Sequence, residues 1–523
     1  MPTELTSNLH LLTPEFALTA LAFLVFTVDL FLPERSKEWL AGLSVVSLVA
    51  VMVIALLMRP AGSVELYGGL IVVDDFGLFF KIFFLGIGVG IIALSWEYAR
   101  DRLQHRGEFY GLLLFSILGM NLLAMSRELL TAYISLELLS FSLYVMVAYG
   151  LREARSNEAG IKYIIIGALS SAIMLYGLSN IYAALGTTYF AGIAEELASP
   201  ALTGTGSGSP VLWIGVALLV VGLGFKLSAV PFHMWAPDAY EGAPLPVTAY
   251  LAIGSKAAAF ALTLRLFAEA IVPAVNLWGE WQLVIAVLAA ITMLLGNLVA
   301  LAQRNLKRLM AYSSIGHVGY ALAGVAVLGS DFALAAKGVI FYLVVYAVTN
   351  LLVFAGVTAY YNREGKDDIA DLAGLADRQP FTAAAIAIGL FSLAGLPIFA
   401  GFTAKFYLFA AVADGGMLWL AGVAIFTSLV SLYYYLQVMR QMYIESPAHV
   451  DHDDAADQAH DDHDDIHQHA AHDEPPVPPM PRPSWLLAGT MGVGLLVVTW
   501  LGVYPAPLLG LIEAASAAIV PLG

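Results

Sequence analysis

The chain has 523 residues, of which 60% are hydrophobic and only 12% are charged. Soluble proteins carry about 25% charged residues, so this composition excludes a soluble globular protein and indicates an integral membrane protein. The absence of cysteine excludes disulfides, cysteine-ligated iron–sulfur clusters and thiolate zinc sites in this chain. The net charge of −16 comes largely from one acidic insert. Because the basic residues flank loops and form no patch, we expect no nucleic-acid binding.

Long apolar runs separated by polar connections predict an all-α membrane protein. A span needs about 20 apolar residues, and on that measure the chain contains about fourteen spans. The predicted spans cover residues 12–32, 39–58, 76–96, 109–126, 129–149, 159–184, 211–230, 246–270, 281–302, 309–329, 333–360, 381–410, 417–443 and 484–505.

The loop arginines and lysines are distributed unevenly. Most of them, from Arg35 to Arg482, lie on one set of alternating connections, and the opposite set holds only Arg59, Arg127 and Arg265. The positive-inside rule places the first set in the cytoplasm. Both termini are then predicted on the non-cytoplasmic side, which requires an even number of spans.

The remaining basic residues are all lysines within predicted spans, and no arginine lies in one. Burial lowers the pKa of a lysine and a neighbouring carboxylate raises it again, so intramembrane lysines suit switchable proton carriers. We expect two of them, near span ends, to snorkel towards the headgroups. The others include three near a span centre or beside a break, where snorkelling is difficult. The two snorkelling candidates are Lys81 and Lys337, and the rest are Lys162, Lys226, Lys256 and Lys405.

Two spans carry a matching interruption. Pro231 breaks the helix that contains Lys226, because proline removes a backbone donor. The segment Leu227–Pro231 matches Leu393–Pro397 as leucine, two small residues, an aliphatic residue and proline, and Lys405 follows the second break. The breaks are five spans apart, and an odd shift inverts orientation. The chain therefore predicts two inverted five-helix repeats, each with a broken helix, which is where transporters bind their ions.

The predicted domains follow from these repeats. The first repeat covers residues 109–270 and the second covers 281–445. Accessory helices precede them in residues 1–108, and a C-terminal helix follows in 484–523. We expect the polar groups of the accessory helices and of the span ends to lie at solvated edges, and the loop 191–210 to be a linker. These edge residues are Asp29, Asp74, Asp75 and Glu128.

Four other polar residues are candidates for proton transfer. Glu137 lies near the middle of a span, where a carboxylate is either protonated or paired with a lysine of another helix. Lys162 either pairs with Glu137 or leads inward from the cytoplasm. His233 and His317 are candidate relays because histidine titrates near neutrality, with a structural hydrogen bond as the alternative for each.

The insert at residues 446–483 is rich in histidine and aspartate. Such a tract is a weak candidate for zinc or nickel binding through His460, His463 and His467. Because the histidines follow no fixed spacing, we expect a disordered, solvated cytoplasmic loop.

Five segments together carry a family resemblance. The chain resembles the antiporter-like membrane subunits of proton-pumping NADH–quinone oxidoreductase, respiratory complex I, and within them the subunit N family. The lysine at 405 argues against subunit M, where a glutamate is expected, and the lack of a long C-terminal amphipathic extension argues against subunit L. The matching segments are LELLSFSLYV around Glu137, IKYIIIGALSS around Lys162, FKLSAVPFHMWAPDAYEGAP around Lys226, YSSIGHVGY around His317 and LAGLPIFAGFTAKFY around Lys405.

This resemblance implies proton translocation coupled to electron transfer to quinone. It implies that Glu137 pairs with Lys226, that Lys256 links the two halves, that His317 occupies a polar relay position and that Lys405 serves the exit side. The chain would hold no cofactor, because flavin, iron–sulfur clusters and quinone belong to partner subunits. Its expected partners are M-like and K-like membrane subunits in the lipid bilayer of a bacterial plasma membrane. The alternatives are an Mrp-type cation/proton antiporter subunit and a passive membrane anchor.

Overall fold

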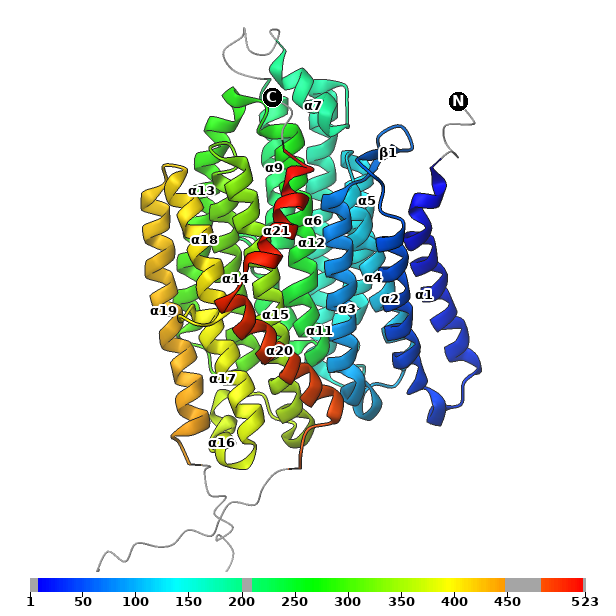
Figure 1. The fold of residues 1–523 in the computed structure, drawn as a ribbon, viewed down its shortest axis with the longest axis vertical. Helices are drawn as coiled ribbons and strands as arrows, with labels where there is room; N and C mark the ends of the chain where they lie inside the picture. Colours follow the sequence, from blue (N-terminus) through cyan, green and yellow to red (C-terminus); the bar gives the residue numbers. More distant parts are fainter. Residues whose placement is uncertain (1–7, 200–208, 447–480, 521–523) are drawn as a thin grey trace, which may run out of the picture.

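A computed structural model describes residues 8–199, 209–446 and 481–520 as a bundle of long helices that run side by side (Figure 1). The helix α1 begins and α21 ends at the same end of this bundle, whereas α19 ends and α20 begins at the opposite end.

The helices and strands of the described residues have the following bounds. The longer helices are α1 (Thr13–Phe31), α2 (Trp39–Leu57), α3 (Asp75–Arg102), α4 (Arg106–Met125), α5 (Leu129–Val147), α6 (Ala154–Leu185), α9 (Pro210–Leu227), α12 (Lys256–Leu266), α13 (Val275–Ala300), α14 (Leu306–Ala326), α15 (Phe332–Glu364), α17 (Pro380–Ala394), α18 (Ala400–Asp414), α19 (Leu418–Tyr443), α20 (Trp485–Val503) and α21 (Ala506–Ala517). The short elements are η1 (Leu9–Leu12), η2 (Glu34–Ser36), β1 (Val64–Leu66), β2 (Ile71–Val73), α7 (Phe190–Ala198), α10 (Trp235–Gly242), α11 (Leu245–Tyr250), η3 (Leu251–Ser255), η4 (Phe267–Ile271), η5 (Ile369–Leu372) and α16 (Leu375–Arg378).

The helices agree with the predicted spans. Within the described residues, 12 helices are long and apolar enough to cross a membrane. The two other predicted spans are also helical: 309–329 falls largely in α14, and 381–410 is divided into α17 and α18. A helix satisfies its own backbone hydrogen bonds, which lipid requires. The all-helical membrane fold is confirmed, and fourteen crossings stay a prediction.

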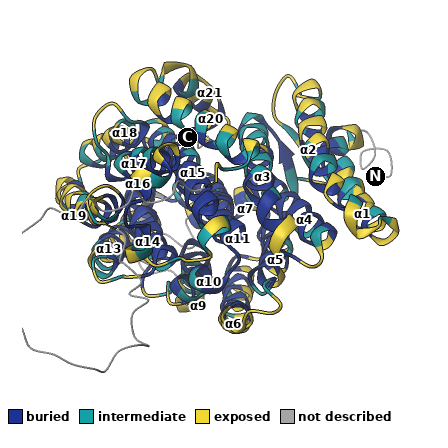
Figure 2. Ribbon diagram, turned by 90° about the horizontal axis from the view of Figure 1, so that it is seen from below, coloured by how far each residue is buried: buried dark blue, intermediate teal, exposed yellow. Residues whose placement is uncertain are grey.

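Burial separates central helices from lipid-facing ones. The continuous helix of α11, η3, α12 and η4 is buried along its whole apolar stretch, and α15 is mostly buried beside it (Figure 2). Outer helices expose large apolar side chains, such as Phe31 on α1, Ile165 on α6 and Leu429 on α19. The helix α20 packs across α15, α17 and α3, and so closes the bundle on that side.

Two predictions about connections were incomplete. The all-α prediction missed the antiparallel hairpin of β1 and β2, which pairs Val64 with Val73. The predicted linker 191–210 begins inside α7, which packs against η4. Both elements lie at the bundle end where α1 begins (Figure 1).

The prediction that no arginine lies inside a span was wrong. The guanidinium of Arg265 is fully buried and donates to both carboxylate oxygens of Asp74, each at 2.8 Å. It also donates to Glu269 at 3.0 Å and to the Ala124 carbonyl at 2.8 Å. Glu269 accepts in turn from Arg127 at 2.6 Å. The cluster ties α3, η4 and the α4–α5 connection together, because a buried charge is stable only when it is paired.

Several other charges expected at solvated edges are also buried. Asp29 pairs with Lys37 at 3.3 Å. Glu128 caps α5 by accepting from the backbone N–H groups of its first turn. Asp75, also predicted at a solvated edge, is partly exposed and pairs with Arg59. The hydropathy pattern places these residues near the ends of predicted spans, but it does not show which other part of the chain packs against them.

The two lysines expected to snorkel differ from one another. Lys81 is buried and pairs with the buried Glu15 at 2.7 Å, so the snorkelling prediction was wrong for it. Lys337 pairs at 2.8 Å with the largely exposed Glu513 of α21. Lys337 therefore remains at the edge of the bundle.

The Arg265 cluster makes the first testable prediction. The substitution Arg265→Gln leaves Asp74 buried without its cation, which should destabilise the protein by about 3–5 kcal/mol. We expect a clearly lower melting temperature of the purified protein in detergent. The matched control is Arg59→Gln, which removes an exposed arginine from the neighbouring Asp75 and should leave the melting temperature nearly unchanged. Equal melting temperatures for the two variants would contradict a structural role for the cluster.

Candidate functional site

The first broken helix is formed by α9 and α10. The helix α9 ends where Ser228 adopts the left-handed conformation at φ 63, three residues before Pro231. The freed backbone groups find partners, because the indole of Trp235 donates to the Phe225 carbonyl at 2.9 Å and the Val230 N–H donates to Thr292 at 3.0 Å. Irregular backbone at membrane depth is tolerated only when it is satisfied in this way.

Lys226 lies in the last turn of α9, directly before this break. Its ammonium is buried, donates to the hydroxyl of Ser140 on α5 and lies 5.3 Å from the ring centre of Tyr144. The negative end of the helix dipole favours a cation at this position. The break therefore creates a site for a buried ammonium.

Glu137 lies one turn from Ser140 on α5 and accepts a hydrogen bond from Ser171 of α6 at 2.5 Å. Among the described residues, no ion pair within 4.0 Å joins Glu137 to Lys226. The direct pairing implied by the resemblance is thus absent in this conformation. Instead, each charged group has a serine as its partner: Glu137 accepts from Ser171, and Lys226 donates to Ser140.

The second broken helix is formed by α17 and α18. The helix α17 ends where Gly395 adopts φ 87, and the Gly401 N–H at the start of α18 donates to the Ser392 hydroxyl at 3.1 Å. The ammonium of Lys405 reaches back from α18 and donates to the Ala394 carbonyl at 3.1 Å and to Ser428 at 2.8 Å. Lys405 therefore also lies at the C-terminal end of the first half of a broken helix.

Lys256 occupies the buried central helix. It follows the π-helical turn η3, a local irregularity that is frequent at functional sites. Its ammonium donates to Ser314 of α14, whose hydroxyl also accepts from Tyr346 of α15 at 2.7 Å. Three helices thus converge on one buried hydroxyl.

His317 lies one turn beyond Ser314 on α14. Its Nδ1 is 2.5 Å from the Tyr342 hydroxyl and its Nε2 is 3.3 Å from the Tyr435 hydroxyl. The imidazole is also close to Tyr346 and Tyr320, with ring centres at 5.0 and 5.6 Å. Because the ammonium of Lys405 lies 5.1 Å from the Tyr320 ring centre, His317 stands between the two lysines.

The space between Lys226 and Lys256 is aromatic. Trp235 packs near Phe225 and Tyr240, with ring centres at 5.4 and 6.4 Å. Lys256 is 5.4 Å from the Tyr240 ring centre. In the part of the chain that the structure describes, no hydrogen bond links the two lysines across this segment. From Lys256 towards Lys405, hydrogen-bonded groups around Ser314, His317 and Lys405 follow one another and are joined by ring contacts of Tyr346 and Tyr320.

Two predicted relay residues lie outside this series. Lys162 is exposed and pairs with Glu158 at 2.8 Å and Asp238 at 2.9 Å, so of its two alternatives the pairing with Glu137 is absent from this structure. Among the described residues, no hydrogen bond joins His233 to Lys226, and the buried Nδ1 of His233 has no hydrogen-bond partner.

Lys162 and Asp238 belong to a cluster that lines a polar cavity of 260 Å³. Arg308 bridges this cluster by donating to Asp238 and Glu241, each at 2.9 Å.

The candidate metal ligands lie elsewhere. His460, His463 and His467 fall outside the described residues. Within residues 8–199, 209–446 and 481–520, no group of three or more histidine, cysteine, aspartate or glutamate side chains could hold a metal ion.

Sequence reasoning missed most of the neutral partners. The predicted site contained the charged residues and histidines, whereas the structure adds hydroxyl groups that connect them. The available signal was the spacing of Tyr342 and Tyr346, four residues apart on an apolar helix, which places both side chains on one face. The added residues are Ser314, Tyr320, Tyr342, Tyr346, Ser428 and Tyr435.

Comparisons with known proteins agree with this arrangement. The transmembrane family described as NADH:quinone oxidoreductase/Mrp antiporter matches residues 126–431. The NADH-quinone oxidoreductase subunit N of Moorella thermoacetica is 41% identical over 502 residues, which are 96% of this chain and 97% of that protein. A chain of respiratory complex I from Thermus thermophilus superposes with a TM-score of 0.75 at 29% identity, covering 96% of this chain and 100% of that one. A chain of the Mrp complex from Dietzia is similar in fold, with a TM-score of 0.77 at 23% identity over 99% of this chain and 98% of that one.

The fold and the buried lysines therefore define a membrane subunit of the NADH:quinone oxidoreductase/Mrp antiporter class. Within this class the chain belongs to the NADH-quinone oxidoreductase subunit N family.

The second break makes a prediction about packing. A Cβ atom at Gly401 would overlap the backbone carbonyl of Ser392, so Gly401→Ala should push α18 away from α17 and separate Lys405 from the Ala394 carbonyl. We expect a loss of about 1–3 kcal/mol in stability, typical of overpacking. The matched control is Gly422→Ala on α19, where a Cβ meets nothing within 4 Å and alanine favours the helix. Thermal denaturation of the purified complex compares the stability of the two variants. A Gly401→Ala variant as stable as the wild type would contradict the close packing of α18 against Ser392.

Proposed function

We propose that this chain is a proton-translocating membrane subunit of an NADH–quinone oxidoreductase in a bacterial plasma membrane. The observation that carries this proposal is the series of buried groups from Lys256 through Ser314 and His317 to Lys405, with Lys226 at the other broken helix. Intramembrane ionisable groups that face the interior of a bundle mark ion pathways. The family of the chain supports the same conclusion.

We propose further that residues 109–270 and 281–445 are inverted repeats. The equivalent environments of Lys226 and Lys405 support this, because each ammonium lies at the C-terminal end of a half-helix. Interrupted helices in corresponding positions of two halves are the usual sites of transported ions. Residues 1–108 form the accessory layer, and the helices of 484–523 close the bundle.

In this mechanism the position of the Glu137 carboxylate controls how tightly Lys226 holds its proton. When α5 moves so that the carboxylate pairs with the ammonium, the proton is held tightly. When the pair opens to the conformation with Ser171, the lysine holds its proton less tightly and releases it towards Lys256. A change of one pKa unit corresponds to about 1.36 kcal/mol. Moving one charge against a membrane potential of ~150 mV needs roughly 3.5 kcal/mol. A change of a few units in the pKa of Lys226 is enough to supply this free energy.

The entry and exit routes complete the path. The polar cavity around Lys162, Asp238 and Arg308 supplies protons from the side that the basic residues predict to be cytoplasmic. From Lys256 the proton passes through the hydroxyls of Ser314 and Tyr346 to His317 and Lys405, and leaves on the opposite side. Redox chemistry with flavin, iron–sulfur clusters and quinone belongs to partner subunits, and M-like and K-like subunits are the neighbours.

The central prediction concerns the first broken helix. In purified complex reconstituted in sealed vesicles, Lys226→Ala and Glu137→Gln should each lose most of the quinone reductase rate together with most of the proton uptake. The reason is that a coupled pump cannot turn over when its proton carrier or its switch is missing. The matched control is Lys337→Gln, since that lysine lies in a span but pairs with an exposed carboxylate at the edge.

Assembly must be confirmed for each variant before rates are compared. Wild-type rates in assembled Lys226→Ala complexes would make the charges purely structural, as in a passive membrane anchor. Proton uptake in the same vesicles also distinguishes the redox-coupled pump from an Mrp-type antiporter. An Mrp-type subunit exchanges sodium for protons without an electron donor. We expect proton uptake that requires NADH and quinone and persists in sodium-free buffer.

A further prediction concerns the neutral relay. The substitution Tyr346→Phe removes the hydroxyl that donates to Ser314, and should slow proton uptake severalfold while the complex stays assembled. Tyr360→Phe is the matched control on the same helix, because the Tyr360 hydroxyl donates to the Asp371 carbonyl away from the lysines. Equal uptake rates in the two variants would exclude Tyr346 from the path.

A further inference from the structure

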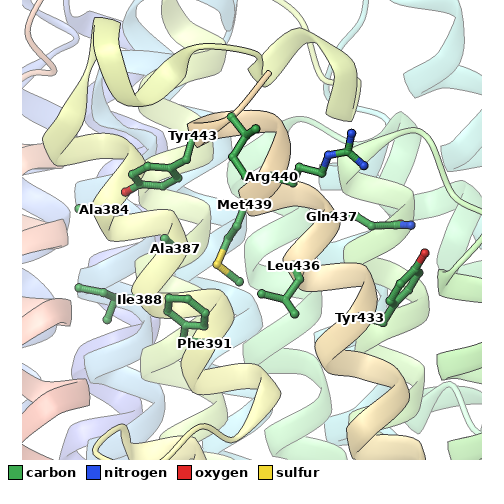
Figure 3. Close-up of a pocket in the computed structure, with 11 residues that line it drawn as sticks. Ala384, Ala387, Ile388, Phe391, Tyr433, Leu436, Gln437, Met439, Arg440 and Tyr443 are labelled. Carbon is green, nitrogen blue, oxygen red and sulfur yellow. The ribbon is translucent and has the colours of Figure 1, made fainter. Parts of the chain in front are cut away.

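A large groove lies between α17 and α19, the two helices whose Ala394 and Ser428 also bind Lys405. Its volume is 750 Å³, within the roughly 300–1,000 Å³ typical of ligand sites. Figure 3 shows that α17 contributes Ala384, Ala387, Ile388 and Phe391, and that α19 forms the opposite wall. The small alanine side chains leave the space open, and most of the lining is apolar. The occupant must therefore have a substantial apolar part.

Of the four polar side chains that line the groove, Tyr433 lies at one end of the α19 wall and the other three lie towards the other end. Gln437, Arg440 and Tyr443 lie in the last turns of α19, whereas Phe391 and Leu436 lie deeper along the groove (Figure 3). The amide of Gln437 is exposed at the surface of a spanning helix and has no hydrogen-bond partner among the described residues. The amide is therefore free to donate to an occupant that brings a hydrogen-bond acceptor to this end.

Arg440 adds a positive charge one turn above Gln437. Its guanidinium is 2.7 Å from Glu445, and both side chains are substantially exposed. An exposed ion pair of this kind is weak. A phosphate, which arginine binds in bidentate fashion, can replace the carboxylate of Glu445. The end of the groove is therefore suited to an anionic headgroup.

The length of the groove indicates what fills it. Its lining runs from Ala384 to Phe391 on α17 and from Tyr433 to Ile444 on α19. At 1.5 Å per residue these stretches extend about 10 and about 16 Å along the helices. The hydrocarbon core is about 30 Å thick, so the groove is about as long as one leaflet. This length matches the acyl chains of a lipid, which occupy one leaflet.

We propose that this groove binds an anionic phospholipid. The acyl chains pack against Ala387, Ile388 and Phe391, the phosphate pairs with Arg440, and Gln437 donates to an ester carbonyl. This site lies on the outer surface of the bundle and does not depend on the proposed proton path.

The test uses the purified complex in phosphatidylcholine vesicles that contain spin-labelled phosphatidylglycerol or spin-labelled phosphatidylcholine. We expect the motionally restricted signal to favour phosphatidylglycerol about fivefold, as one arginine near an anionic lipid contributes roughly 1 kcal/mol. Arg440→Gln should abolish that preference, and Ala387→Phe should remove restricted lipid by filling the groove.

The controls match each substitution. Arg100→Gln removes an arginine that is similarly exposed and paired with Asp101, and Leu429→Phe enlarges a lipid-facing side chain of α19 outside the groove. Both should retain the wild-type preference. An equal signal for the two lipids in the wild type, or an unchanged preference in Arg440→Gln, would overturn the proposal.

A second measurement does not depend on a destabilising variant. A photoreactive benzoylphenylalanine at the exposed position Leu436 should form an adduct with the mass of a phospholipid after illumination of native membranes. A cross-link to a peptide of another subunit would show that a protein fills the groove and would refute the lipid assignment.

Discussion

The structure depends on how a positive charge can be kept inside a membrane. An ammonium buried away from water is stable only with oxygen partners around it. Lys226, Lys256 and Lys405 obtain these partners from serine hydroxyls and, for Lys405, from a carbonyl that a helix break leaves free. The second break therefore supplies Lys405 with an oxygen partner that an intact helix lacks, because an intact helix has no unpaired carbonyl in its interior.

The buried cations fall into two kinds that differ in their partners. Arg265 faces the carboxylates of Asp74 and Glu269, and Lys81 faces that of Glu15. Such pairs fix helices to one another, and removing one partner leaves an unpaired charge. The three central lysines are hydrogen-bonded to neutral oxygens instead, so a lysine that loses its proton leaves no unpaired anion beside it. In the proposed mechanism, this difference separates charges that hold the bundle together from charges that exchange protons.

The arrangement of helices keeps these two kinds apart. The carboxylate-paired Arg265 cluster joins α3 and η4 near the hairpin, whereas the lysine series runs through the buried helices α12, α14 and α15 and ends at α18. The outer helices expose apolar side chains to lipid, and the groove between α17 and α19 lies on that outer surface. The Arg265 cluster, the lysine series and the groove thus occupy different parts of the same bundle.

Hydropathy and the two proline breaks were sufficient to predict most of the helices and the two broken spans, because each depends on residues close together in the chain. Pairings were not predictable: Lys162 meets Asp238, Arg265 meets Asp74, and the carboxylate of Glu137 meets Ser171. Lys405 follows its break by eight residues and Lys226 precedes its own by five, yet folding brings each to the end of a half-helix. The sequence by itself determined which apolar runs form helices and where two of those helices are interrupted. Only the tertiary structure decided which oxygens surround each cation, because those oxygens lie on other helices whose rotation and neighbours no local pattern specifies.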